Sequence, residues 1–225
     1  MEIIINSENQ RDKFDIIKKK ILRTELGMRA IAVMYNEHYY DLVSSRNIYR
    51  LKDNVFYRLE TSLAQYELFT NEISRFNYVM SERTKQESEF CFDQFKLMPY
   101  TSKMNLMTSS IFDSIIFHSV SIFDYLSHYI SYIISPNKCN TLYWTKLAKS
   151  AYGKDNYISK RPIKEVIKQV DDYLVKKLYD YRSDLIHNSH KQCSFHTSFN
   201  AKSSNIKIEI EVPINNSSKV YHHSN

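Results

Sequence analysis

An arginine and a histidine, Arg182 and His187, are separated by four residues near the C-terminal end of the chain. Arginine carries a permanent positive charge whose planar donors suit a phosphate group, and histidine can transfer a proton near neutral pH. A ribonuclease that uses no metal needs both a cation for the phosphorus centre and a proton carrier. We therefore take Arg182 and His187 as the candidate catalytic pair.

The spacing of the pair is compatible with one turn of a helix and the residues next to it. In an α-helix, five residues advance about 140° around the axis and about 7.5 Å along it, an offset that the long arginine side chain can bridge. Ser183 and Asp184 precede His187 by four and three residues, the separations at which helical side chains meet. Either of them could therefore hydrogen-bond the imidazole and fix its tautomer.

The helix that must position this pair is indicated by the residues before it. Apolar side chains recur at three- and four-residue steps, the period of an amphipathic helix. They are Ile163, Val166, Ile167, Val170, Leu174, Leu178, Tyr181 and Leu185. Pro162 suits the first turn of such a helix. The pattern predicts a single helix with Arg182 and His187 at its C-terminal end.

At Arg182-Ser183-Asp184-Leu185-Ile186-His187 the chain resembles the HEPN superfamily, helical-bundle proteins whose signature is an arginine, four to six residues and a histidine near the end of the last core helix. The family often has asparagine after the arginine, where this chain has Ser183. Some toxin members have a tyrosine two residues after the histidine, where this chain has Ser189. The resemblance covers about residues 105–190, which would form the HEPN-like core.

The resemblance implies that the chain is a metal-independent endoribonuclease, of the kind found among prokaryotic toxins and defence proteins. His187 would act as general base or general acid and Arg182 would stabilise the phosphorane, giving a 2′,3′-cyclic phosphate and a 5′-hydroxyl. The family dimerises so that two motifs face each other, and we expect a homodimer here. The expected partners are RNA, a second copy and an antitoxin or regulator, with no cofactor.

Two other interpretations of the motif stay open. The chain could be a non-catalytic HEPN-like module that binds RNA, a nucleotide or a protein partner through the same surface. In the structural interpretation, Arg182 is an exposed arginine and His187 interacts with the negative end of the helix.

Other polar residues are weaker candidates for chemistry. Asp124 and His128 lie one turn apart on an apolar segment and could form a second acid–base pair, although such pairs are more often satisfied buried hydrogen bonds. His190, with His187 and Asp184, could offer metal ligands, but zinc needs further partners that the local sequence lacks. We therefore expect no metal. Trp144 with Tyr143, in a short helix beside a glycine break, could present an edge on which a base stacks.

The remaining patterns predict a mainly α fold, an HEPN-like bundle with an N-terminal helical extension. Helices are expected at about 7–26, from near residue 28, at 47–80, at 106–134 and at 141–152, and Pro99 should interrupt any helix around it. Alternating residues after 190 predict two strands with a turn at 200–205. The expected organisation is one all-α domain, 1–190, then a β-hairpin appendage and flexible tail, 191–225.

Composition narrows the class of protein. The net charge of +6 is compatible with a phosphate-bearing partner. Three widely spaced cysteines suit a reducing interior, and the N-terminal residues do not resemble a signal peptide. The apolar segment 106–134 contains Asp113, His118, Asp124 and His128, which are costly in a bilayer. We expect a cytoplasmic protein with no membrane partner. Only two glycines, Gly27 and Gly153, exclude a glycine-rich phosphate loop or dinucleotide fingerprint.

Overall fold

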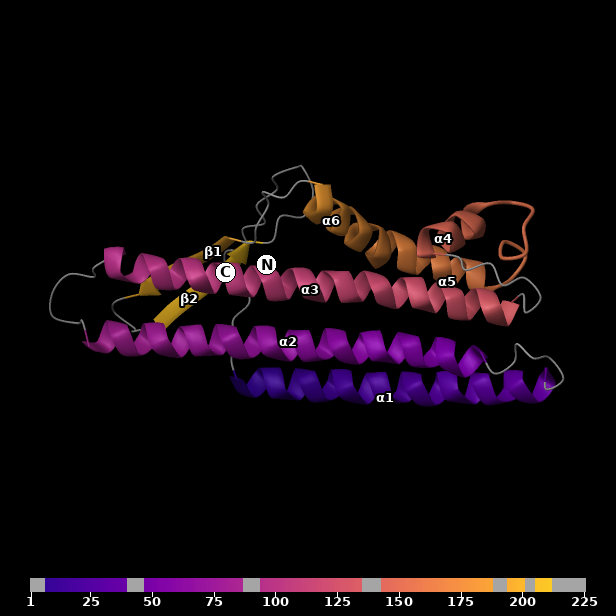
Figure 1. Cartoon of the computed structure of the whole chain (residues 1–225), viewed down its shortest axis with the longest axis horizontal. Coiled ribbons are helices and arrows are strands. Elements are labelled where there is room, and N and C mark those ends of the chain that lie inside the picture. Colours follow the sequence, from indigo (N-terminus) through magenta and orange to yellow (C-terminus); the bar gives the residue numbers. More distant parts are fainter. Residues whose placement is uncertain are drawn as a thin grey trace. The chain divides into compact units, whose positions relative to one another are not determined.

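The computed structural model describes residues 7–39, 47–86, 94–134, 143–187, 194–200 and 205–211. These residues are mainly helical, as the sequence predicts. In chain order the helices are α1 (Ser7–His38), α2 (Asn47–Gln86), α3 (Gln94–Ile134), α4 (Trp144–Tyr152), α5 (Ile163–Val170) and α6 (Lys176–His187), with a π-helical turn, η2 (Asp171–Val175), between the last two. Two strands follow, β1 (Ser194–Asn200) and β2 (Asn205–Glu211) (Figure 1).

The chain divides into two compact units, each built from separate segments. Unit 1 consists of residues 1–13, 64–115 and 183–225, and unit 2 consists of residues 14–63 and 116–182. The long helices α1, α2 and α3 each contribute to both units, and so does α6. The prediction of one domain over residues 1–190 stays a prediction.

The core of unit 2 joins α1, α2 and α3. Its buried residues come from all three helices: Met28, Ala32, Tyr35, Ile48, Val55, Phe56, Tyr129 and Tyr132. The phenol of Tyr129 donates a hydrogen bond of 2.9 Å to the backbone carbonyl of Met28, which ties α3 to α1. Burial of this phenol raises the pKa of Tyr129 to about 12, because the charged form would lose its hydration.

A second core cluster in unit 2 lies where α4 and α5 pack. It contains Trp144, Leu147, Ala148, Ala151, Ile158, Ile167 and Val175. Trp144 is only 2% exposed, and its ring meets that of Phe123 edge-on at 5.2 Å. The expectation of a stacking edge at Trp144 with Tyr143 is therefore wrong for Trp144, whereas Tyr143 is exposed. Burying the large apolar indole against an apolar helix stabilises the fold more than leaving it exposed to solvent.

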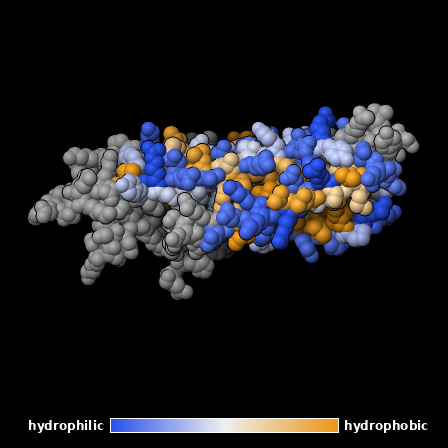
Figure 2. Space-filling model, turned by 90° about the horizontal axis from the view of Figure 1, so that it is seen from below, coloured by the Kyte–Doolittle hydropathy of each residue, from blue (hydrophilic) through white to orange (hydrophobic). Residues whose placement is uncertain are grey.

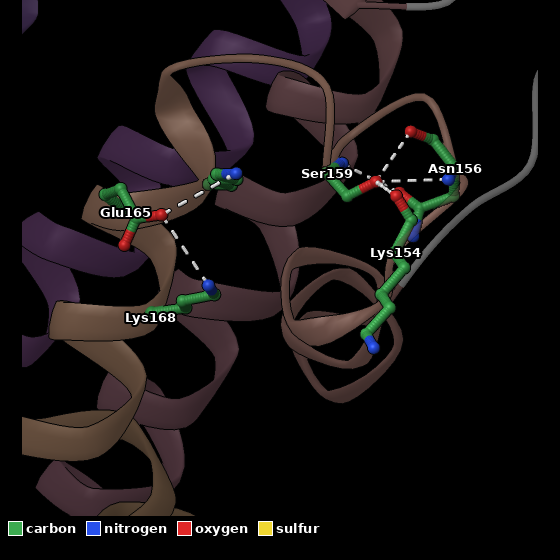
Figure 3. A network of polar contacts seen from close by, with 6 residues as sticks. Lys154, Asn156, Ser159, Glu165 and Lys168 are labelled. Atoms are coloured by element: carbon green, nitrogen blue, oxygen red, sulfur yellow. Dashed lines mark hydrogen bonds and ion pairs between the residues drawn. The ribbon is translucent and has the colours of Figure 1, made fainter.

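The segment between α4 and α5 is held by the side chains of Asn156 and Ser159 (Figure 3). Asn156 Oδ1 accepts hydrogen bonds from the backbone N–H groups of Ile158 and Ser159, and Asn156 Nδ2 donates to the carbonyl of Ser150. Ser159 Oγ accepts from the N–H of Asn156 and lies 2.9 Å from the carbonyl of Lys154. These bonds fix the direction in which α5 begins.

The N-terminal and middle helices are longer than their sequence patterns indicate. Helix α1 runs without a break through Gly27, where two helices were expected. An exposed glycine lowers helix stability without preventing a helix that buries one face. Helix α3 begins at Gln94, so Pro99 lies inside it near its start, and the expected interruption is wrong. A proline there removes one backbone hydrogen bond, which the remaining thirty-five residues of the helix outweigh.

The predicted helix from Pro162 to His187 is interrupted by the turn η2. A π-helical turn contains an extra residue, so the buried face shifts along the sequence. Val175 is fully buried, whereas the expected core residues Val166 and Leu174 are 57% and 40% exposed. Beyond the turn the buried residue is Tyr181, as the pattern predicts. The turn thus sets which residues of α6 face α3.

Within unit 1, α2 and α3 pack through aromatic rings. The rings of Phe69 and Phe112 lie 6.0 Å apart, and those of Phe76 and Tyr100 stack at 5.8 Å. Strands β1 and β2 pair antiparallel, with Ser194 opposite Glu211. The predicted turn residues 201–204 and the tail from residue 212 lie outside the described residues.

Two parts of the described chain carry notable apolar residues: the exposed surface of α1 and a long stretch of α3. Helix α1 exposes large apolar residues beside its charged ones: Ile16, Ile17, Leu22, Leu26, Ile31, Val33 and Met34. Figure 2 shows such a mixture of apolar and hydrophilic residues on the face seen from below. In α3, the stretch Ser102–Ile134 is long and apolar enough to cross a membrane by those two criteria alone. The same stretch carries Tyr129 and Tyr132, which lie in the unit 2 core.

Candidate functional site

The candidate motif lies at the end of α6. Arg182 is half-buried within the helix, and His187 is its last residue. The side chain of His187 lies outside the described part of the chain, as does all of His190. The prediction that the motif ends a helix is confirmed for the backbone.

The guanidinium of Arg182 lies against α3. Its central carbon is 5.6 Å from the centre of the Phe117 ring, within the range of a cation–π contact. Its Nε is buried and has no hydrogen-bond partner. The salt bridges among the described residues do not include Arg182. The positive charge therefore lies against an aromatic ring, and no carboxylate of the described residues forms an ion pair with it.

The two residues after Arg182 differ in exposure. Ser183 is exposed, and its position four residues before His187 leaves it available to a group at the helix end. Asp184 is half-buried and already takes part in an interaction of its own. Of the two residues expected to orient His187, Ser183 is therefore the more exposed, and Asp184 already has another interaction.

Asp124, in α3, forms hydrogen bonds to residues of α4 and α6. Its Oδ1 accepts a hydrogen bond from the backbone N–H of Trp144, at 3.1 Å, and a short one from the phenol of Tyr179. Burial, followed by the bond to Asp124, raises the pKa of Tyr179, while the positive charge of Arg182 acts in the opposite direction. The hydrogen bond from Tyr179 thus links Asp124 to the helix that carries the motif. Tyr179 lies one helical turn before Arg182.

The π-helical turn adds a parallel contact. The indole Nε1 of Trp144 donates a 2.8 Å hydrogen bond to Oδ1 of Asp171, the first residue of η2. Trp144 therefore connects to Asp124 through its backbone and to Asp171 through its side chain. Together with Tyr179, these bonds fix α6 relative to α3 and α4 inside unit 2.

Asp124 and His128 do not form the pair that their spacing suggests. Oδ1 of Asp124 accepts hydrogen bonds from Trp144 and Tyr179, whereas His128 Nε2 is buried and has no hydrogen-bond partner among the described residues. The His128 ring lies between those of Tyr125 and Tyr143, with centroids 6.1 and 6.0 Å away. Burial lowers the pKa of His128, and the nearby charge of Asp124 only partly opposes this. His128 is therefore a neutral aromatic neighbour at pH 7.

Sequence reasoning missed a second arginine–histidine pair. Arg58 Nη1 lies 3.1 Å from Nδ1 of His118, and the two residues are sixty positions apart. His118 stood out only as a polar interruption of an apolar segment, and nothing near Arg58 pointed to it. Only the packing of α2 against α3 brings them together.

Neither metal binding by the described residues nor similarity to known proteins assigns a function to this site. Among the described residues, no group of three or more His, Cys, Asp or Glu side chains could hold a metal ion. No family model, curated protein or solved structure matches the chain. The likeness to the HEPN superfamily therefore rests on the six-residue motif and its place at the end of a helix.

Proposed function

We propose that the chain is a metal-independent endoribonuclease of HEPN type, with Arg182 and His187 as its catalytic residues. The observation that carries the proposal is the arginine of the motif. It is held at the end of α6 against Phe117, without an ion pair to any described carboxylate. A cation placed in this way can stabilise charge that develops on a phosphate.

In the proposed reaction, the 2′-hydroxyl of a ribose loses its proton to His187 and its oxygen attacks the adjacent phosphorus. The bond from phosphorus to the 5′-oxygen then breaks, and that oxygen takes up a proton. The products are a 2′,3′-cyclic phosphate and a 5′-hydroxyl. Arg182 stabilises the extra negative charge of the phosphorane, and Ser183 or Asp184 orients the imidazole.

One histidine does not serve easily as both base and acid in a single turnover, so we propose a homodimer in which two motifs face one RNA strand. A second copy would supply the other proton carrier. The exposed apolar residues of α1 offer additional surface that a second copy or an antitoxin would bury. We place the protein in the cytoplasm, as a toxin or defence protein.

The test is cleavage of labelled RNA in excess chelator. The native chain should yield products with cyclic phosphate ends, and His187→Ala should reduce the rate by at least about a hundredfold, the usual contribution of a general acid or base. Arg182→Lys keeps the charge but loses the planar fork, so it should be impaired less than Arg182→Gln. Arg161→Gln is the matched control, because Arg161 is exposed and bonded to Tyr157.

The alternative is a non-catalytic helical module that binds RNA, a nucleotide or a protein partner. It is favoured if the folded native chain and His187→Ala give the same background across a broad RNA panel. In that case Arg182→Gln would still weaken binding, because the cation would contact phosphate without promoting a reaction. Equal cleavage by all variants would instead point to a contaminating nuclease.

A further inference from the structure

We propose that Arg58 and His118 form a binding site for a phosphate group on the α2–α3 surface of unit 2. The site is separate from the motif residues Arg182 and His187 and does not depend on their catalysing any reaction. Its components are a guanidinium without an ion pair among the described residues, a histidine whose Nδ1 accepts from that guanidinium, and two hydroxyls on the same two helices.

The first component is the charge of Arg58. The salt bridges of the described residues do not include Arg58, and its Nε is buried with no hydrogen-bond partner. Its guanidinium lies 5.7 Å from the ring centre of Tyr125 and 5.5 Å from that of Tyr57. These rings hold the plane of the guanidinium but accept none of its N–H groups in a normal hydrogen bond. In the described part of the chain, no carboxylate therefore forms an ion pair with this cation.

The second component is the tautomer of His118. A guanidinium can only donate, so the 3.1 Å contact makes Nδ1 of His118 the acceptor and puts the ring proton on Nε2. Burial and the charge of Arg58 both lower the pKa of His118, in keeping with a neutral ring. The pair therefore presents N–H donors from both residues, with a net charge of one positive unit.

The third component is a pair of hydroxyls. Ser62 Oγ and Ser119 Oγ lie 3.4 Å apart. Ser62 follows Arg58 by one helical turn on the same face of α2. Ser119, next to His118 in the sequence, belongs to this set through its contact with Ser62. Guanidinium, imidazole N–H and hydroxyl groups are the donors with which proteins bind phosphate oxygens. An acidic ligand group fits this set, whereas a cation or an apolar ligand does not.

Because Arg58 Nε is buried, a ligand reaches it only if a neighbouring side chain moves. Of the two rings that contact the guanidinium, Tyr57 is 62% exposed and Tyr125 is half-buried, so in the proposed site Tyr57 is the ring that moves. Arg58 could then offer Nε and one terminal nitrogen to two oxygens of the same phosphate, the usual bidentate geometry.

The phosphate group could be free or part of a nucleic acid strand, and two probes distinguish these sources. The probes are inorganic phosphate and a short oligothymidylate, which has no 2′-hydroxyl and cannot be cleaved by the proposed reaction. The readout is the imidazole nitrogen resonances of the chain labelled with 15N-histidine. The His118 signals are assigned among the eight histidines by their loss in His118→Gln.

We expect the His118 signals to shift saturably with at least one probe. The shift should persist in Arg50→Gln, a control on an exposed arginine two turns earlier in α2, and disappear in folded Arg58→Gln. If Arg58→Gln does not fold, Arg58→Lys should raise the dissociation constant at least tenfold. Saturation by phosphate alone identifies a small-anion site, and saturation by the oligothymidylate alone identifies a nucleic acid contact.

The proposal is overturned if neither probe shifts the His118 signals saturably, or if the shift is unchanged in Arg58→Gln or Arg58→Lys. Arg58 would then be an arginine held only by aromatic rings. Because the readout is binding at His118, this result is independent of RNA cleavage by the native chain. Loss of cleavage in His187→Ala with no phosphate binding at His118 would support the proposed function and exclude only this site.

Discussion

The phenol of Tyr179 donates a hydrogen bond to Asp124, so the helix that carries the candidate motif is fastened to α3 by a charged acceptor. The bond lies three residues before Arg182, whose guanidinium also contacts α3 at Phe117. A bond to a carboxylate is stronger than one between neutral groups. The position of Arg182 therefore depends on a residue that takes no part in the proposed reaction.

We expect Tyr179→Phe to lower the free energy of unfolding by about 1.5 to 3 kcal/mol, the usual contribution of a hydrogen bond to a charged group. Asp124 would keep the backbone N–H of Trp144 as its donor. The measurement is urea unfolding followed by circular dichroism. Tyr173→Phe is the control, because Tyr173 is 79% exposed, and its effect should stay within about 0.5 kcal/mol. Equal effects of the two changes would contradict a role for this bond.

Stability should fall as the pH is lowered from 7 to 5. Burial lowers the pKa of both His118 and His128 below 6.5, so near and below this pH the unfolded chain binds more protons than the folded one. The stabilisation is present above pH 6.5 and is lost as the pH falls through this window. Unfolding midpoints in urea at each pH measure it. His128→Phe should reduce the slope, and an unchanged slope would show that His128 is not desolvated in the folded chain.

Gly27→Ala should stabilise the chain by about 0.5 to 1 kcal/mol, because glycine in a helix interior costs conformational entropy. Gly27 is exposed in the middle of α1, and a Cβ there would meet no atom within 4 Å. Thermal unfolding of the variant should show a higher midpoint. A lower midpoint would mean that this face of α1 is covered in solution, for example by a second copy.

Gly153→Ala should destabilise, in contrast to the change at Gly27. A Cβ at Gly153 would lie 2.7 Å from Nδ2 of Asn156, which is pinned by its hydrogen bond to Ser150. The backbone of Gly153 has φ of −70°, so the cause is lack of space and not an unusual conformation. Double substitution Gly153→Ala with Asn156→Ala should cost less than the sum of the two single changes. Additive losses would contradict this contact.

The sequence predicts the helices better than it predicts their contacts. Apolar spacing is a local property, and it locates α2 and the helix that ends at His187. The π-helical turn breaks this rule, because five residues there close a wider turn and Val175 takes the buried place expected for Leu174. Bonds such as Tyr179 to Asp124 and Arg58 to His118 join residues more than fifty positions apart, and no local pattern predicts them.

The turn η2 also determines how the chain can tolerate loss of a residue. Because the π-helical turn holds one residue more than an α-helical turn, deleting one residue between Asp171 and Val175 would let the segment continue as an ordinary α-helix, with the residues after it at nearly the same angle around the axis. Tyr179 would then keep its bond to Asp124, and Arg182 its contact with Phe117. A deletion within the α-helical segment Ile163–Val170 has no extra residue to remove, so it would turn α6 by about 100° and point the motif in another direction.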